Sequence, residues 1–162
     1  MFYTTCLHAS ENAEPLVIEM PELGVRITVP GMPKIEMGVH PLNEQSSVYR
    51  LHGTNGITSV SILTPEVNTE ISPVTCASAI AEYILTQQPV TRDQVFLGRA
   101  NDETFLIIYG LPMDQAVLRN THIISSRDAV HCVEAHVSKI STSDSDIEPW
   151  FNGFGDSSIE KL

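Results

Sequence analysis

The sequence predicts an α+β fold: an antiparallel or mixed β-sheet with one main helix and a short C-terminal helix packed on it. Three observations support this prediction. Apolar residues recur at every second position in many short runs, one segment has helical spacing, and the links between the later runs are short. Strand and helix segments are segregated along the chain, which favours helices packed on a sheet over alternating βαβ units. The length of 162 residues fits a single globular domain, residues 1–162.

Five short strands are expected in the first part of the chain. They are Leu16–Met20, Val25–Val29, Ile35–Val39, Ser47–His52 and Ile57–Leu63. The last two flank the sequence Gly53-Thr54-Asn55-Gly56. Because Gly and Asn accept positive φ angles, this turn predicts a β-hairpin.

The main helix is expected to begin at Ser72-Pro73. Ser72 suits the N-cap, and Pro73 suits the first helical position because its missing N–H costs little there. Four apolar residues then follow helical spacing: Ala77, Ile80, Ala81 and Ile84. The helix should end before Pro89, because proline disfavours helical backbone in the residue that precedes it.

A four-strand meander is expected after this helix. Its strands are Val95–Arg99, Thr104–Tyr109, Ala116–Ile124 and Ala129–Ser138. Short polar links between them favour antiparallel neighbours. Ile147–Phe154, which includes Trp150 and Phe151, is predicted to form the short C-terminal helix, and the last residues are expected to fray.

The charge of the chain limits the partners that it can bind. Nine basic and twenty acidic residues give a net charge of −11, and no Lys/Arg cluster offsets it locally. Nucleic acid and anionic membrane surfaces are therefore not expected as partners, since both are bound through basic side chains. A basic protein or a metal cation would be attracted, although the charge could equally serve only solubility.

The cysteines and the termini suggest a cytoplasmic protein. Cys6, Cys76 and Cys132 are widely spaced and odd in number, so we expect reduced thiols and no disulfide framework. No basic region followed by an apolar core marks a signal peptide, although Met1 could follow a removed one. The most apolar stretch, Phe105–Met113, is shorter than the roughly 20 residues that a membrane span needs.

One strand carries a grouping that suggests chemistry. Alternation in Ala129–Ser138 places Cys132, Glu134 and His136 on one face. Cα atoms four residues apart on a strand are separated by about 13 Å, so Cys132 and His136 cannot easily share one ion. Glu134 with either neighbour could bind a metal if His122 on the adjacent strand points the same way. The alternative is an ordinary strand face with a structural cysteine.

Two further readings concern catalysis and calcium. A Cys132 nucleophile would need a nearby imidazole and an electropositive setting, and the net charge opposes that setting. Asp144, Asp146 and Glu148 begin like a calcium loop, but Pro149 and Gly155 occupy the positions that need Gly and Glu. Acids at a helix N-terminus are the alternative. No G-x-S-x-G, P-loop or H-E-x-x-H motif is present, so an enzyme is not favoured.

The order of the predicted elements resembles that of the PsbP-like α/β sandwich family. The local match is Gly24-Val25-Arg26-Ile27-Thr28-Val29-Pro30, which is similar to an early family strand ending in proline. The resemblance covers the stretch from Leu23 to Phe154. It implies a non-catalytic scaffold that binds proteins, and no functional residues of the family can be transferred, because no specific motif matches.

The leading hypothesis is a non-enzymatic, acidic protein-binding module: an inhibitor, an immunity protein or a secretion-effector chaperone acting on a basic partner. Its candidate partner-binding residues are Glu134, His136, Asp144, Asp146 and Glu148. No cofactor or metal is expected. The alternative is a small metal-binding protein or a hydrolase that uses Cys132, Glu134 and His136. A third hypothesis is a homodimer formed through an exposed sheet edge.

Overall fold

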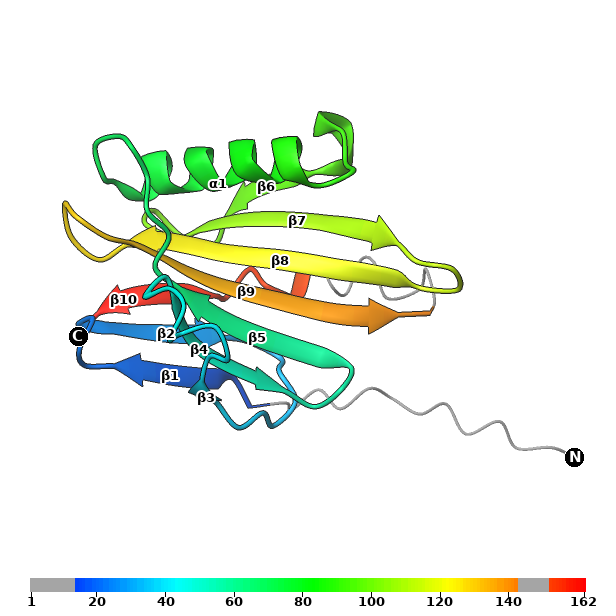
Figure 1. Ribbon diagram of the computed structural model, residues 1–162, viewed down its shortest axis with the longest axis horizontal. Helices are drawn as coiled ribbons and strands as arrows, with labels where there is room; N and C mark the ends of the chain where they lie inside the picture. Colours follow the sequence, from blue (N-terminus) through cyan, green and yellow to red (C-terminus); the bar gives the residue numbers. More distant parts are fainter. Residues whose placement is uncertain (1–13, 143–151) are drawn as a thin grey trace, which may run out of the picture.

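The protein consists of two antiparallel β-sheets and one main helix (Figure 1). The computed structural model describes residues 14–142 and 152–162. The larger sheet has seven strands: β3 (Gly38–Val39), β4 (Tyr49–Thr54), β5 (Thr58–Leu63), β6 (Phe96–Arg99), β7 (Phe105–Pro112), β8 (Val117–Ser126) and β9 (Cys132–Ser141). The smaller sheet has three: β1 (Leu16–Met20), β2 (Val25–Val29) and β10 (Ser158–Lys161). The helix α1 spans Pro73–Gln87, and a short 3₁₀ turn, η1, spans Arg92–Gln94.

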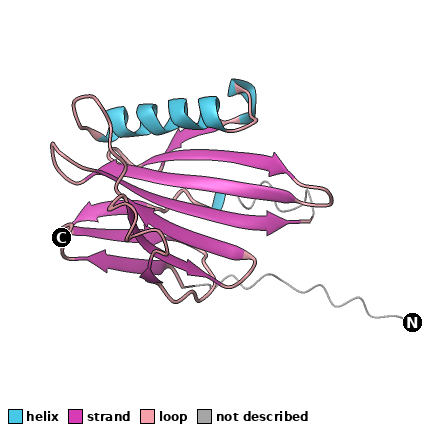
Figure 2. Ribbon diagram, viewed as in Figure 1, coloured by secondary structure: helices cyan, strands magenta, loops and turns pink. Residues whose placement is uncertain are grey.

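The strand order in the larger sheet is β3-β4-β5-β9-β8-β7-β6 (Figure 2). The predicted four-strand meander is confirmed, because β6, β7, β8 and β9 are consecutive neighbours. All strand pairs that the structure describes are antiparallel. The α+β prediction is thus confirmed in its antiparallel form.

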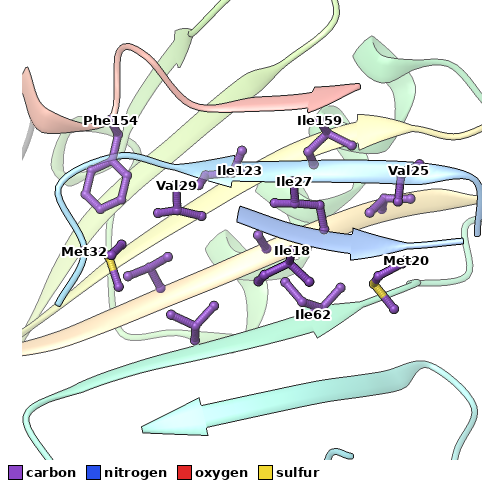
Figure 3. Close-up of a cluster of buried hydrophobic side chains, with 14 of the residues drawn as sticks. Ile18, Met20, Val25, Ile27, Val29, Met32, Ile62, Ile123, Phe154 and Ile159 are labelled. Carbon is purple, nitrogen blue, oxygen red and sulfur yellow. The ribbon is translucent and has the colours of Figure 1, made fainter. Parts of the chain in front are cut away.

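The main core lies between the two sheets (Figure 3). Ile27 of β2 and Ile62 of β5 are fully buried there, as are Val133, Ala135 and Val137 of β9. These β9 residues are the odd-numbered apolar positions of the predicted alternation, so they share one face. Burying a Val or Ile side chain fully, instead of leaving it exposed, stabilises the fold by about 1.5–3 kcal/mol. The even-numbered positions of β9 consequently point to the opposite face.

Helix α1 covers that opposite face of the seven-stranded sheet, across β7 and β8 (Figure 1). Its predicted start is confirmed: the Ser72 hydroxyl accepts a hydrogen bond from the Thr75 amide, and Pro73 is the first helical residue. Ile80 and Ile84 are buried against the sheet, as the helical spacing predicts. The helix therefore forms the roof of a second, smaller core.

The predicted hairpin is confirmed between β4 and β5. Gly56 has a φ angle of +91°, which only glycine adopts readily. The Asn55 side-chain oxygen accepts hydrogen bonds from the amides of Ile57 and Thr58. The turn residues thus satisfy the backbone where the chain reverses. The strand expected at Ile35–Val39 is shorter than predicted, because only Gly38–Val39 pairs with β4.

The C-terminal residues do not fray, so that expectation is wrong. They form β10, which pairs with β2 and places Ile159 opposite Ile27 (Figure 3). Most of the predicted terminal helix, Ile147–Phe154, lies outside the described residues, as do Trp150 and Phe151. Its last residue, Phe154, is buried in the core between the sheets.

Candidate functional site

A polar cluster lies beneath α1, on the helix-facing side of the larger sheet. It consists of Tyr109 on β7, His122 on β8, and Glu134 and His136 on β9. Strand register places His122 directly opposite His136. The same face carries the apolar residues that pack on the helix, so four polar side chains are held within a largely apolar layer. We call these four residues the polar cluster.

Two members of the polar cluster form a buried ion pair. The Nδ1 atom of His122 lies within hydrogen-bonding distance of the Glu134 Oε1 atom. The His122 Nε2 atom lies 3.2 Å from the Tyr109 hydroxyl. Tyr109, His122 and Glu134 are 5%, 6% and 7% exposed, so these contacts are shielded from bulk water. A carboxylate in this position orients the imidazole ring as well as pairing with it.

His136 stacks on His122 and makes its own hydrogen bond. The two rings lie 4.2 Å apart at 6° to each other. His136 Nε2 lies 2.9 Å from the Asn120 side-chain oxygen, and the Asn120 amide nitrogen donates to the Leu118 carbonyl at 3.1 Å. Because that second bond fixes the oxygen of Asn120 toward His136, His136 must donate from Nε2. Its Nδ1 atom is therefore the ring nitrogen that carries the lone pair when the ring is neutral.

Burial and mutual charge control ionisation in the polar cluster. Burial, together with His122, lowers the pKa of His136 to about 3, which outweighs the opposite effect of Glu134. Burial raises the pKa of Glu134, but the charge and hydrogen bond of His122 reverse this, so the net pKa is lowered. Burial, and then the Glu134 charge, raises the pKa of Tyr109 to about 12. At neutral pH the site thus contains an ionised Glu134, a neutral His136 and a protonated Tyr109.

A pocket of about 690 Å³ opens onto the polar cluster. Its volume is within the range of ligand-binding clefts. The polar cluster lines it, together with apolar residues of α1 and of the chain around β5: Val48, Leu63, Pro65, Val67, Ala79, Ile80 and Ile84. Exposed Glu66, Asn68 and Tyr83 also line it and form its rim. Among the described lining residues there is no Lys or Arg.

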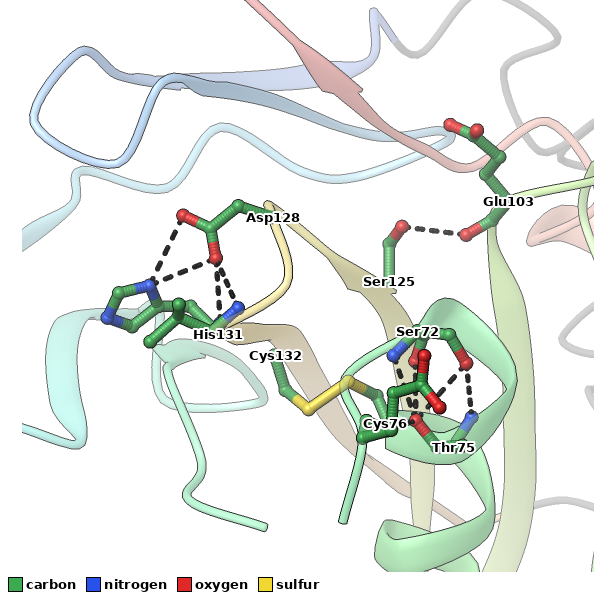
Figure 4. Close-up of a disulfide and its surroundings, with 10 residues drawn as sticks. Ser72, Thr75, Cys76, Glu103, Ser125, Asp128, His131 and Cys132 are labelled. Atoms are coloured by element: carbon green, nitrogen blue, oxygen red, sulfur yellow. Dashed lines mark hydrogen bonds and ion pairs between the residues drawn. A yellow bond between two sulfur atoms is a disulfide. The ribbon is translucent and has the colours of Figure 1, made fainter.

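A disulfide joins the roof of this pocket to its floor. Cys76, in the first turn of α1, is bonded to Cys132 at the start of β9 (Figure 4). The expectation of reduced cysteines is therefore wrong for this pair. The two residues are 56 positions apart, and only the packing of α1 on the sheet brings them together. The site residue Glu134 follows Cys132 by two positions on the same strand face.

The turn that precedes β9 is also held by side-chain contacts. The Asp128 carboxylate accepts hydrogen bonds from the amides of Val130 and His131, at 2.7 and 2.9 Å (Figure 4). These bonds lower the pKa of Asp128, although the small burial of the group opposes them. The Asp128 side chain thus satisfies two backbone amides immediately before β9 begins.

The sequence-predicted site is brought together in part. Glu134 and His136 share a face with Cys132, and His122 points toward them, as expected. That face is covered by α1, however, so Glu134 is buried and is not placed for long-range steering from the surface. Asp144, Asp146 and Glu148 lie outside the described residues.

Two residues of the site are absent from the sequence prediction. Tyr109 lies in a nearly continuous apolar run, and no sequence motif marks Asn120 as a site residue. Strand register places Tyr109 in the polar cluster and Asn120 beside it as the partner of His136, because Tyr109 lies opposite Asn120 on the neighbouring strand. The alternation of Asn120 and His122 in β8 was the one signal that could have indicated a polar face.

The structure weakens two hypotheses about the site: that it is a hydrolase site and that it binds a metal. Cys132 has no free thiol to act as a nucleophile or metal ligand, so the hydrolase and metal hypotheses lose that residue. Within residues 14–142 and 152–162, no group of three His, Cys, Asp or Glu side chains is placed to hold a metal ion. What remains is a carboxylate–imidazole–phenol cluster at the floor of a pocket.

No protein-family model matches the chain, and no curated protein matches it. In the described part of the chain, no helix has the length and apolarity needed to cross a membrane.

Proposed function

We propose that this chain is a non-enzymatic binding module for a basic protein partner, with the pocket beneath α1 at the centre of the contact. The observation that carries the proposal is the charge of the pocket. Glu66 lies at its rim and Glu134 at its floor; His122 pairs with Glu134, nothing in the described lining pairs with Glu66, and the lining offers no Lys or Arg. A pocket of this kind favours cationic groups from a partner.

The net charge of the whole chain supports the same proposal. A charge of −11 produces a field that attracts basic proteins and speeds their association. Inhibitors, immunity proteins and secretion-effector chaperones are the roles we propose for such a module. As part of this proposal, the chain has the PsbP-like sandwich architecture that its element order resembles. It also does not bind nucleic acid or membranes.

Two further predictions concern the oligomeric state and the location of the protein. A homodimer through a sheet edge stays a prediction; β6 is an edge strand on which Phe96 and Leu97 are about half exposed. The cytoplasmic location also stays a prediction. The Cys76–Cys132 bond argues against it, because disulfides persist mainly in oxidising compartments.

Partner capture at two salt concentrations tests the proposal. The immobilised chain is incubated with lysate of its host, and retained proteins are identified by mass spectrometry. We expect a protein of high isoelectric point at low salt and its loss at high salt, because exposed charge pairs are screened. Glu66→Gln should weaken this capture.

The matched control is Glu160→Gln on β10, which removes the same charge from the far side of the larger sheet. It should leave capture nearly unchanged. Equal effects of the two variants would contradict a contact centred on the pocket, and capture that does not depend on salt would contradict an electrostatic partner.

A further inference from the structure

We propose that the pocket beneath α1 binds a primary ammonium group carried on an unbranched aliphatic chain, as in a lysine side chain. This inference rests on the proposed function and specifies the group that the partner inserts. Three observations support it: the hydrogen-bonding capacity left open at the pocket floor, the pocket walls, and the absence of Lys and Arg from the described lining, where His122 pairs with only one oxygen of Glu134.

The first open acceptor is the Glu134 carboxylate. Its Oε1 atom accepts from His122, and the structure gives its Oε2 atom no hydrogen bond from any described residue. An ionised carboxylate presents about four lone-pair sites, and a single neighbour leaves most of them unused. The Oε2 atom is not among the buried, unpartnered side-chain atoms of the described residues, so it is accessible from the pocket and open to a donor on a ligand.

The second open acceptor is Nδ1 of His136. Donation from Nε2 to Asn120 leaves Nδ1 with a lone pair, and the described residues supply no donor to it. Because the pKa of His136 is about 3, this lone pair persists at neutral pH. Glu134 and His136 line the same pocket from adjacent positions on one face of β9. Because two acceptors are open at the pocket floor, a ligand with more than one N–H donor would match them best.

The geometry favours an ammonium over a guanidinium group. Arginine binds carboxylates best through a planar fork that uses both oxygens. Here His122 already occupies one oxygen of Glu134, so the fork is incompletely matched. An ammonium has three donors arranged about one atom and can divide them between separate acceptors.

The pocket walls suit an aliphatic stem. Leu63 and Val67 lie on one part of the lining, and Ile80 and Ile84 of α1 lie on another. Lysine buries such a stem against apolar surface while its charge remains hydrogen-bonded. Tyr83 and Tyr49 add aromatic rings to the same lining, and these attract cations through their faces.

Titration with n-pentylamine tests the inference. Pentan-1-ol is the neutral analogue of the same length, and pentylguanidine is the planar cation. Binding is followed by calorimetry and by NMR shifts of the Glu134 carboxyl carbon and the His136 ring. We expect pentylamine to bind about tenfold or more tightly than pentan-1-ol, which is the worth of one charged hydrogen bond. Pentylguanidine should bind more weakly than pentylamine.

Two variants make the result specific. Glu134→Gln keeps an oxygen for His122 but removes the charge, and it should reduce pentylamine affinity about tenfold or more. His136→Phe keeps a ring stacked on His122 but removes Nδ1, and it should also weaken binding. Thermal melts confirm that each variant is folded. Equal binding of pentylamine and pentan-1-ol, or full binding by a folded Glu134→Gln, would overturn the inference.

A further arm separates the sources of the amine and separates this inference from the proposed function. Lysine blocked at both backbone ends is compared with free pentylamine. Binding of both supports a lysine side chain, whereas binding of pentylamine alone assigns the pocket to a free amine. Salt-sensitive capture of a basic partner that is unaffected by Glu134→Gln would uphold the proposed function and overturn this inference.

Discussion

At the scale of residues, Glu134 and His136 are neighbours on one strand face, and both have a lowered pKa, so that at neutral pH Glu134 is charged and His136 is neutral. Glu134 stays ionised because His122 supports its charge, and His136 stays neutral because burial and His122 disfavour a second positive charge. Coupled buried groups of this kind make folding depend on pH. Both groups line the pocket, so the acceptors that they leave open are available to a ligand.

The pKa of His136 predicts a loss of stability in acid. Its ordinary value is 6.5 and its folded value is about 3, so between these values the unfolded state binds a proton that the folded state does not. Stability is therefore full above about pH 6.5 and falls as the pH drops toward 3, by roughly 1.4 kcal/mol per pH unit for this group. The lowered pKa of Glu134 acts in the same direction below its ordinary 4.5.

Urea unfolding at pH 7, 5.5 and 4.5 measures this dependence. His136→Gln should have a shallower loss of stability between pH 6.5 and 4.5 than the wild type. The matched control is His131→Gln, which alters a partly exposed histidine in the turn before β9 and should keep the wild-type slope. A slope unchanged by His136→Gln would show that another group titrates.

At the scale of elements, the Cys76–Cys132 bond holds α1 on the strand that carries Glu134 and His136. We predict that reduction, or the double substitution Cys76→Ala with Cys132→Ala, lowers the free energy of unfolding by about 3–5 kcal/mol. This is the range for closing a loop of intermediate length, and here the separation is 56 residues. Thermal and urea unfolding of oxidised and reduced protein measure the effect.

The same change should loosen the roof of the pocket. Amide hydrogen exchange in α1 should become faster on reduction, while exchange in β2, on the other side of the larger sheet, should change less. The reduced wild type and the double variant should agree. Unaltered exchange in α1 would mean that packing of Ile80 and Ile84 alone holds the helix in place.

Local patterns predicted many elements well. The bounds of β1 and β2, the start of α1 at Pro73 and the β4–β5 hairpin all follow from residues close in sequence. β10 was missed because Ser158–Lys161 is short and half charged, and it becomes a strand only by pairing with β2. The disulfide was missed for a similar reason: no short-range spacing relates two cysteines that tertiary packing brings together.

The candidate site was predictable only along one strand. The period of two placed Glu134 and His136 on one face, and it indicated His122 as a neighbour. It did not predict that α1 covers this face or that Tyr109 lies beside His122, because both depend on which strands pair and on the register between them. A surface role for Glu134 was therefore inferred where the structure has a buried floor.

At the scale of the whole molecule, the two ends of the described chain meet in one sheet. β10 adds to β2, and its Ile159 fills the core between the sheets at 5% exposure. We predict that Ile159→Ala lowers stability by about 2–5 kcal/mol, since it removes a buried side chain and leaves a cavity. Thermal and urea unfolding provide the measurement.

Val17→Ala is the matched control, because it shortens an apolar residue of the same sheet that is 50% exposed. Its effect should be within about 0.5 kcal/mol. Similar losses for both variants would contradict a structural role for β10, whereas a loss confined to Ile159→Ala would support it.

The pocket floor carries an ionised carboxylate, paired with His122 through one oxygen, and acceptors that no described residue satisfies. An NMR titration of the Glu134 carboxyl carbon and the His136 ring nitrogens tests this central claim most directly. We predict an ionised Glu134 at pH 7, and a neutral His136 that carries its proton on Nε2 from pH 7 down to about pH 4. A protonated Glu134 or a charged His136 at neutral pH would contradict the claim, and with it the case for a cationic ligand.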